Sequence, residues 1–313
     1  MYKVGVLTLD GFALMSYASL IEPLRAANLL SEKPLYEVLN VTTHVSGAVS
    51  SSGMRVGADR TIAENVKLDF LFVIAGGDPF LINDKKLFTW LRRLAKFGTT
   101  IGGISGGPVI LIKAGIMAGR RMTVHWEHAE GLSEFGHNII LERSLYVFDR
   151  DRMTCAGGTA PMDMMLALIS IHQGAVFAQF VSDWFLHTEI RPSEGSQRGG
   201  LAARIGSNNS LVLSAVELME NHLADPLSLS QLASLVGICE RQINRVFRHN
   251  LGKPTMSYYR GLRVNKAKNL LKNSRLKISE IAEATGFSNP SHLSGVFSDI
   301  YGFPPSKYRV ASH

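Results

Sequence analysis

The sequence has very little cysteine, no long apolar run and no low-complexity tract. Cys155 and Cys239 are its two cysteines, and thiols so far apart form neither a disulfide framework nor a zinc site. No apolar stretch reaches the roughly 18 residues that suggest a membrane span. The residues from Met1 to Leu7 lack the order of a signal peptide. We therefore expect a cytoplasmic globular protein that uses neither membrane, metal nor cofactor.

Acidic residues are scarce only in the last third of the chain. Residues 1–206 hold 20 Lys and Arg against 19 Asp and Glu, whereas residues 207–313 hold 13 against 7. A polyanion would therefore bind the last third, although a basic tail that merely aids solubility has the same composition. The length of 313 residues is about that of two domains.

The first part of the sequence alternates strand patterns with helical ones. Strands are predicted at Lys3–Thr8, Tyr36–Val41, Asp69–Ala75 and Thr99–Ile104, and helices at Phe12–Leu30, Lys85–Lys96, Thr159–His172 and Ala175–His187. Continuous apolar runs such as Asp69–Ala75 are typical of strands buried on both faces. The predicted fold class is α/β, a flavodoxin-like, mostly parallel sheet sandwiched by helices and followed by an all-α domain of two helix-turn-helix units.

The predicted domains are residues 1–190 and 210–313, joined by a linker at 191–209. The linker is rich in Gly, Ser and Asn and reads as exposed. It is too polar and too glycine-rich to transmit strain as a rigid rod. After it, every pattern is helical.

An internal duplication is the strongest signal in the sequence. Leu229-Ser-Gln-Leu-Ala recurs as Ile278-Ser-Glu-Ile-Ala at an offset of 49 residues. Residues further along recur at an offset of 50, and these pairs are Ile243 with Leu293, Phe247 with Phe297, Gly252 with Gly302, Pro254 with Pro304, and Tyr258 with Tyr308.

Each repeat has the pattern of a helix-turn-helix, with a glycine in the turn at Gly237 or Gly286. In the first repeat, the apolar face of the second helix carries Ile243, Val246 and Phe247. The opposite face carries Arg241, Gln242, Arg245 and Arg248, which suits the major groove of DNA. For a single such helix, a solvated basic face would be the better interpretation. Two tandem units favour double-stranded DNA as the partner.

Residues from about Ser207 to Arg309 resemble the DNA-binding domain of the AraC/XylS family of bacterial regulators. The resemblance rests on Arg241–Phe247, Arg263–Leu271, Ile281–Leu293 and the closing Gly302, Pro304 and Tyr308. It implies a central helix at about Met256–Asn273 that holds two recognition helices about 34 Å apart. It also implies DNA contacts at Asn289, Ser291 and His292, a homodimer, and RNA polymerase as a partner. Gly295 and Ser298 stand where basic residues are usual.

The segment Ile101–Pro108 places Ser105 among glycines between a strand and a helix, which is the pattern of a nucleophile elbow. Gly76-Gly77, after the preceding strand, would offer backbone N–H groups to a ligand. Residues 2–190 resemble the PfpI-like branch of the class I glutamine amidotransferase superfamily, in the form fused to AraC-type domains. Further matches are Glu22–Asn28, Thr123–Glu127 and Cys155–Asp163.

Catalytic members of that branch carry Cys at the position of Ser105 and an acidic residue near Ser16. We therefore predict a retained pocket without chemistry, and no enzyme. Hydrolysis by Ser105 with His125 as base is the alternative, and His125 is equally compatible with a structural role. An enzyme with an accessory DNA-binding module is the second hypothesis for the whole chain, and a pure interaction protein is the third.

The predicted ligand-binding residues are Ser16, Glu22, Gly77, Ser105, His125, Trp126 and Glu127. An indole beside carboxylates suits a cationic amine. Core packing of Trp126 and solvation of Glu127 are the alternative. The resemblance implies the same ligand class, because relatives of this form sense arginine or quaternary amines such as betaine and carnitine. The predicted function is a sequence-specific transcription regulator controlled by such an effector.

Overall fold

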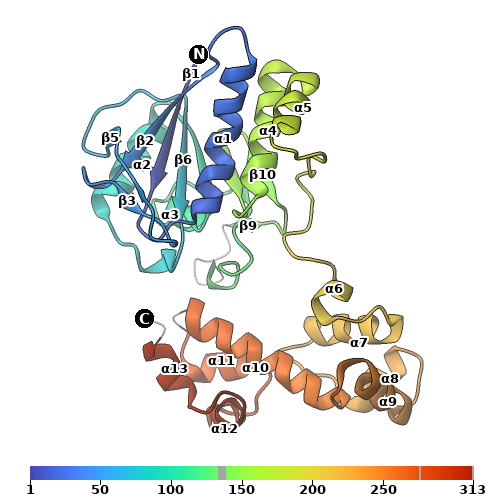
Figure 1. Ribbon diagram of the computed structural model, residues 1–313. Coiled ribbons are helices and arrows are strands. Elements are labelled where there is room, and N and C mark those ends of the chain that lie inside the picture. Colours follow the sequence, from blue (N-terminus) through green and yellow to red (C-terminus); the bar gives the residue numbers. More distant parts are fainter. Residues whose placement is uncertain (133–138, 275, 312–313) are drawn as a thin grey trace. The chain divides into compact units, whose positions relative to one another are not determined.

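The computed structural model describes residues 1–132, 139–274 and 276–311 (Figure 1). It divides the chain into two compact units, Met1–Gln197 and Arg198–His313. The division falls inside the segment 191–209 that the sequence marks as a linker. Within the described ranges, no helix is long and apolar enough to cross a membrane.

A seven-stranded sheet forms the centre of the first unit. Its spatial order is β10 (Tyr146–Asp149), β11 (Arg152–Cys155), β7 (Thr100–Ser105), β6 (Phe70–Ala75), β1 (Tyr2–Thr8), β2 (Tyr36–Thr42) and β5 (Arg60–Thr61). Neighbouring strands are parallel except for β10 and β11. Two short pairs lie outside this sheet, β3 (Ala48–Val49) with β4 (Arg55–Val56) and β8 (Arg121–Met122) with β9 (Ile140–Leu141). The predicted α/β class with a mostly parallel sheet is confirmed.

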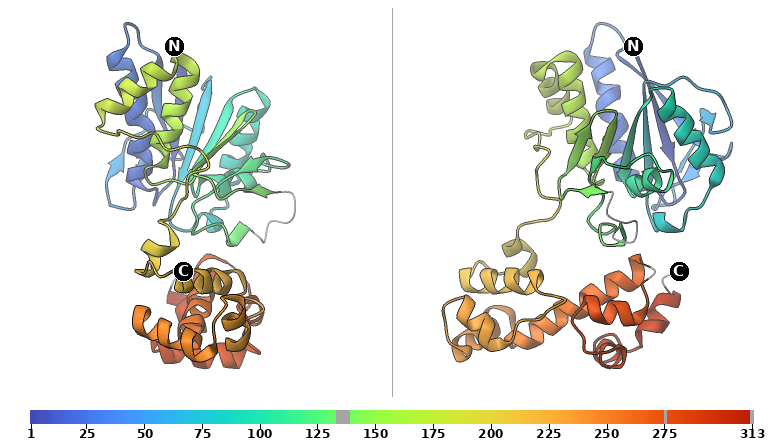
Figure 2. Two further views of the ribbon diagram at one scale, coloured as in Figure 1. Left: turned by 90° about the vertical axis from the view of Figure 1, so that its right-hand side faces the viewer. Right: turned by 180° about the vertical axis from the view of Figure 1, so that it is seen from behind.

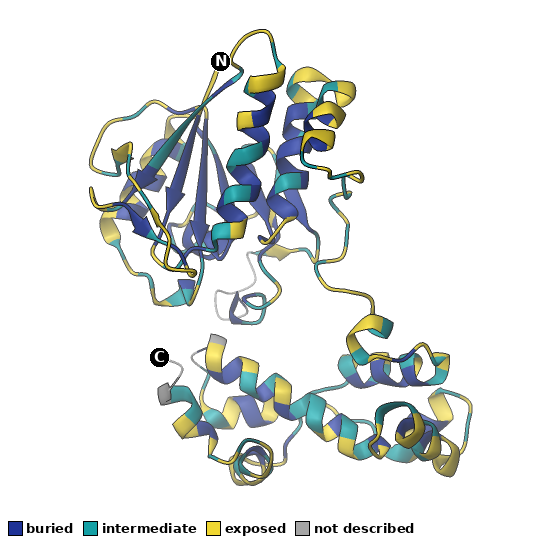
Figure 3. Ribbon diagram, viewed as in Figure 1, coloured by how far each residue is buried: buried dark blue, intermediate teal, exposed yellow. Residues whose placement is uncertain are grey.

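Helices cover both faces of this sheet, so that the unit has three layers (Figure 2). One face packs on α1 (Leu14–Leu30), α4 (Ala160–Gln173) and α5 (Ala175–Trp184), and the other on α2 (Lys85–Lys96) and α3 (Gly107–Lys113). A 3-10 turn, η1, spans Pro79–Leu81. The central strands are buried on both faces, as Figure 3 shows. In β6, Phe72 faces one helical layer and Val73 the other, because successive side chains of a strand alternate.

The second unit is helical throughout. Its elements are α6 (Leu201–Ile205), α7 (Ser210–Asn221), α8 (Leu229–Leu235), α9 (Glu240–Leu251), α10 (Thr255–Asn273), α11 (Ile278–Ala284), α12 (Pro290–Tyr301) and α13 (Pro305–Ala311). Each helix-turn-helix has its own core. One core surrounds Phe247 and Tyr259, and the other surrounds Leu271 and Phe297. The duplicated sequence therefore folds as a duplicated structure.

The segment after α5 is fastened to the first unit, which corrects the expectation of an exposed linker beginning at residue 191. Asp163, fully buried on α4, accepts hydrogen bonds from His187 Nε2 at 3.0 Å and from Arg191 N, Nε and Nη2 at 2.8, 3.0 and 2.6 Å. Gln197 Nε2 donates to Thr123 Oγ1 at 2.9 Å and to Ser144 O at 2.8 Å. The composition of the segment does not indicate these contacts, because they depend on two single side chains, the buried carboxylate of Asp163 and the amide of Gln197.

We expect Asp163→Ala to destabilise the first unit by about 1–3 kcal/mol, since it leaves the donors of His187 and Arg191 without their acceptor. All three tryptophans, Trp90, Trp126 and Trp184, belong to this unit, so tryptophan emission during urea denaturation of the full chain reports its unfolding. The control is Asp183→Ala, because Asp183 bonds an exposed Gln179 on the same surface helix. Equal losses in both variants would contradict the role assigned to Asp163.

Candidate functional site

The turn at Ser105 has the geometry of a nucleophile elbow. Ser105 ends β7 with a φ of 59°, in the left-handed region that non-glycine residues rarely adopt, and it is 7% exposed. The turn is tight because α3 begins immediately against β6. A Cβ on Gly107 would lie 2.0 Å from the carbonyl oxygen of Val73, so only glycine fits there. The close approach of α3 to β6 therefore explains why this segment contains small residues.

A second loop closes over the elbow from the end of β11. A Cβ on Gly157 would lie 2.7 Å from Ser105 Cβ, which shows how closely this backbone approaches the serine. The next residue, Gly158, donates its N–H to Ser16 Oγ on α1 at 2.9 Å. Ser16 is fully buried. The serine at the position of the expected acid therefore holds the loop that covers Ser105.

Gly77 and His125 also belong to this end of the sheet. Gly77 is exposed with a φ of 60°, two residues after Ala75, which pairs with Ser105 across β6 and β7. The N–H of His125 donates to the carbonyl oxygen of Ser105 at 3.3 Å. The structure thus brings Ser16, Gly77, Ser105 and His125 to one edge of the sheet, where the strands of α/β proteins end and ligands bind.

The electrostatics of the elbow do not provide a base for Ser105. Burial lowers the pKa of His125 and outweighs the opposite effect of Glu127, so the ring is neutral near pH 7. Its Nδ1 accepts the N–H of Glu127 at 3.3 Å, which leaves the proton of the neutral ring on Nε2. Among the described residues, no hydrogen bond joins the His125 ring to the hydroxyl of Ser105. Burial also raises the pKa of Cys155 to about 12, so that this thiol stays protonated.

Trp126 and Glu127 follow His125 in a turn, but Glu22 lies elsewhere. Trp126 is 41% exposed, and its ring centroid lies 5.2 Å from that of His125. Glu22 sits on α1 and forms an ion pair with Arg25 at 2.7 Å, with both side chains partly exposed. The ligand contacts of these three residues stay predictions. Glu22 has the weakest geometric support, because its carboxylate is occupied by Arg25.

Sequence reasoning missed several residues that shape this site. Gly157 and Gly158 lie in the segment Cys155–Asp163, which carries the resemblance, but the sequence assigns them no role. Gln197 was predicted to lie in the linker. Gln197 Nε2 also donates to the carbonyl oxygen of Val124 at 3.1 Å, directly before His125. Thr159 Oγ1 accepts from Arg191 Nη2 at 2.8 Å. The paired glycines were the available signal, whereas the contacts of Gln197 leave no local pattern in the sequence.

The first recognition helix, α9, presents the predicted DNA-reading face. Ile243 and Phe247 are buried, whereas the residues of the opposite face are exposed, and these are Arg241, Gln242, Arg245 and Arg248. Gln242 has a second role, because its Oε1 accepts the N–H of Cys239 at 3.1 Å and so caps the helix. Its amide group keeps its N–H donors for a base.

The second recognition helix, α12, has no Lys or Arg. Asn289 is its N-cap, and Asn289 Oδ1 accepts the N–H of His292 at 2.8 Å. Ser291 and His292 are exposed in the first turn, and His292 Nδ1 lies 3.1 Å from Ser288 Oγ. Gly295 faces open space. The contacts that α12 offers to DNA are therefore uncharged or histidine side chains near its N-terminus.

Two contacts fix the helix-turn-helix units to each other. Arg263 on α10 donates Nε to the carbonyl oxygen of Thr285 at 2.8 Å and Nη2 to that of Gly286, while its guanidinium stacks 4.3 Å from the centre of the Phe287 ring. Gly286, with a φ of 67°, packs on the loop between α7 and α8 of the first helix-turn-helix, where a Cβ would lie 2.5 Å from Pro226 Cγ. The second turn is thereby locked to both α10 and the first helix-turn-helix.

Two family models match the chain. A helix-turn-helix domain model matches residues 232–311, and the DJ-1/PfpI family model matches residues 2–171. An AraC family transcriptional regulator of known structure from Pseudomonas putida is 25% identical with a TM-score of 0.53, over 59% of this chain and 100% of its own.

Two named relatives match over nearly the whole length. The HTH-type transcriptional regulator GlxA of Rhizobium meliloti is 41% identical over 99% of this chain and 96% of its own length. The regulator CdhR of Pseudomonas aeruginosa is 36% identical over 97% and 90%. These matches indicate a DNA-binding transcription regulator rather than an enzyme. The chain belongs to the family of HTH-type transcriptional regulators that join a DJ-1/PfpI domain to an AraC-type helix-turn-helix domain.

Proposed function

We propose that this regulator responds to a small amine or amino-acid derivative bound at the Ser105 elbow. The observation that carries the proposal is an intact elbow without a reactive pair. Ser105 keeps its left-handed backbone, while no hydrogen bond joins its hydroxyl to the His125 ring in the part of the chain that the structure describes. A strained residue costs about 1–3 kcal/mol and persists where the surroundings impose it. A role in ligand binding explains why the strained turn at Ser105 is kept although the site lacks a nucleophile–base pair.

The side chains beside the elbow favour a cationic ligand. Trp126 offers a partly exposed indole, and Glu127 adds a carboxylate one residue further along. A cation over an indole gains about 0.5–2 kcal/mol, and a carboxylate attracts its charge, with a charge-assisted hydrogen bond where the cation is a guanidinium. A compound with a guanidinium or quaternary ammonium group satisfies this pair, in the manner expected for arginine, betaine or carnitine.

The route from the site to the DNA-binding unit begins with the fastened segment. Gln197 is the last residue of the first unit, and it bonds Val124 next to His125. Arg191 bonds Thr159, two residues after the glycine that covers Ser105. A ligand that moves the His125 turn would therefore change the hydrogen bonds that hold residues 191–197, the segment that leads to the second unit. The ligand acts through its difference in affinity for the two arrangements.

We further propose that the protein acts as a homodimer in the cytoplasm and communicates with RNA polymerase at its promoters. Support for a second copy comes from α5, where Val176, Phe180 and Trp184 lie four residues apart and are 73, 61 and 51% exposed. Four-residue spacing places them on one face of the helix. A two-fold axis through this stripe would bury it against its own copy.

The first prediction concerns DNA. Arg245→Ala should weaken binding of the full chain to its selected duplex by about 1–3 kcal/mol and alter the preferred sequence, since an arginine that reads a base is lost. The matched control is Gly295→Ala, the corresponding position of the second repeat, which should weaken binding less. The measurement is a titration of duplexes selected from a random library. A larger loss from Gly295→Ala would reverse the ranking of the two helices.

The second prediction concerns Ser105. A serine-directed fluorophosphonate probe should leave the protein unlabelled, because no base activates the hydroxyl. Ser105→Ala should keep regulation by the effector largely intact, as one hydroxyl contact is lost. Mass spectrometry of the treated protein provides the measurement. Labelling of Ser105 in the wild type that disappears in the variant would restore the hydrolase hypothesis.

The third prediction concerns coupling. A thermal-shift screen of amines and amino acids should find a compound that raises the melting temperature of the wild type. Trp126→Ala should lose this response while keeping DNA binding. Operator DNA should change effector affinity by the same factor as the effector changes operator affinity, typically about 5- to 150-fold.

Gln197→Ala should leave the affinity for effector alone and the affinity for operator alone unchanged. It should reduce the coupling factor between them, because the variant removes the hydrogen bonds that join residue 197 to the His125 turn. Gln179→Ala, which removes an exposed glutamine bonded to Asp183, is the control. Effector affinity that is the same with and without DNA in the wild type would exclude equilibrium coupling.

A further inference from the structure

The outer face of α2 is strongly basic. Its twelve residues include Lys85, Lys86, Arg92, Arg93 and Lys96 and no acidic residue. Arg92 is engaged, with Nη2 donating to Thr89 Oγ1 at 3.1 Å. Among the described residues, no ion pair involves Lys86 or Arg93. The first unit as a whole is almost neutral. The positive charge of this helix is therefore a local excess, which acidic residues elsewhere in the unit offset.

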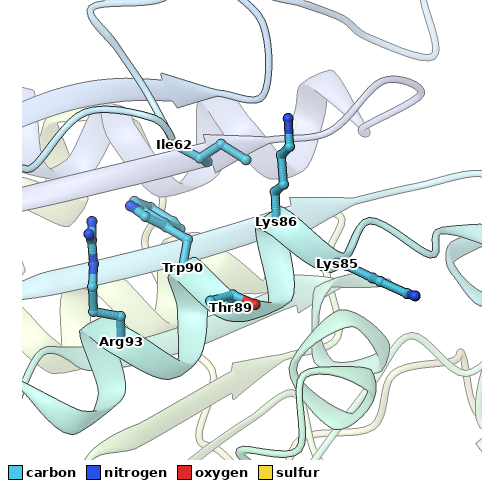
Figure 4. Close-up of a pocket in the computed structure, with 6 residues that line it drawn as sticks. All are labelled: Ile62, Lys85, Lys86, Thr89, Trp90 and Arg93. Atoms are coloured by element: carbon cyan, nitrogen blue, oxygen red, sulfur yellow. The ribbon is translucent and has the colours of Figure 1, made fainter.

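This face contains a hollow of about 400 Å³, a size that suits a small ligand (Figure 4). The hollow is lined by Ile62, Lys85, Lys86, Thr89, Trp90 and Arg93. Lys86 and Arg93 extend toward the side where Ile62 lies, whereas Lys85 points away along the surface. The charges that face the hollow are therefore separated by two turns of one helix and flank an indole.

The indole is the unusual part of the hollow. Trp90 is 4% exposed, and its Nε1 has no hydrogen-bond partner within the part of the chain that is described. Buried donors are nearly always paired, because an unpaired one has lost its hydrogen bond to water. The indole nitrogen lies on the side of Arg93. Because Arg93 is exposed and unpaired among the described residues, its side chain can move to admit an acceptor to this N–H.

The helix N-terminus does not account for the site. Asp84 caps α2, and its Oδ1 accepts the N–H groups of Lys86 and Leu87 at 2.8 and 3.1 Å. The backbone donors of the first turn are therefore in use. What remains for a ligand are the side chains of Lys86, Arg93, Thr89 and Trp90.

We propose that this hollow binds a phosphate group, at a site separate from the elbow. Lys86 and Arg93 would neutralise its two charges, with the guanidinium donating two parallel hydrogen bonds as it does to phosphate elsewhere. The N–H of Trp90 and the hydroxyl of Thr89 would donate to the remaining oxygens. The apolar contact of Ile62 and the indole favours a phosphate ester over the bare ion.

The test is calorimetric titration of the full chain with inorganic phosphate and with phenyl phosphate. The wild type should bind both, the ester more tightly. Lys86→Ala combined with Arg93→Ala should weaken both by tenfold or more. Trp90→Phe keeps an aromatic ring at this position and removes the unpaired N–H donor together with the pyrrole ring, so it should bind more weakly than the wild type.

The control is Lys96→Ala, which removes one positive charge from the same helix outside the hollow. It should change the dissociation constant less than twofold. In a Trp126→Phe, Trp184→Phe background, Trp90 is the sole tryptophan, and its emission should change on adding phosphate. Absence of binding by the wild type, or an equal loss in Lys96→Ala, would overturn the proposal.

A duplex without the selected operator separates the two sources of a phosphate group. If the hollow takes the DNA backbone, the double variant should bind this duplex more weakly and phenyl phosphate should compete with it. If the source is a free phosphate ester, duplex binding should be the same in both proteins while ester binding is lost. Either result supports a phosphate site and assigns its ligand.

Discussion

The first unit is organised by the close approach of β6, β7 and the start of α3. Gly107 lies against the carbonyl of Val73 so tightly that no side chain fits, and this contact turns the chain through a left-handed Ser105. The loop at Gly157 then packs on the serine, and Ser16 holds its neighbour. Of the residues proposed to contact the effector, Ser105 and Gly77 are placed by this turn and its strands, Ser16 contacts the loop that covers it, and His125 bonds the Ser105 carbonyl.

Much of the fold follows from patterns that are local in the sequence. The buried strand Phe70–Ala75 is a continuous apolar run, and the amphipathic pattern predicted the helix Lys85–Lys96 with the bounds that the structure has. The edge hairpin of β10 and β11 escaped sequence reasoning. Its strands are four residues each, and Arg152, buried at 6% exposure beside Asp151, interrupts the apolar pattern. The last predicted helix of this unit was three residues too long, because Leu186 turns into the left-handed region.

The site was predictable only where a residue type has a steric or electrostatic signature. The glycines around Ser105 predict a tight turn, and the arginines on one side of α9 predict an anionic partner. Contacts made by single polar side chains across long separations leave no such trace. Gln197 reaches Thr123 over 74 residues, and Arg191 reaches Asp163 over 28. Glu22 stays a prediction, and its ion pair with Arg25 is a contact that the motif did not indicate.

The lock between Gly286 and Pro226 has a consequence for the DNA itself. Because α10, Arg263 and this contact all join the two helix-turn-helix units, they oppose changes in the spacing of the two recognition helices. Any mismatch with the helical repeat has to be absorbed by bending or twisting the base pairs between the two half-sites. The energy of that deformation depends on base sequence, so bases that no side chain touches contribute to the choice of operator. Gly286, which has no room for a methyl group, would then affect the choice of operator without touching DNA.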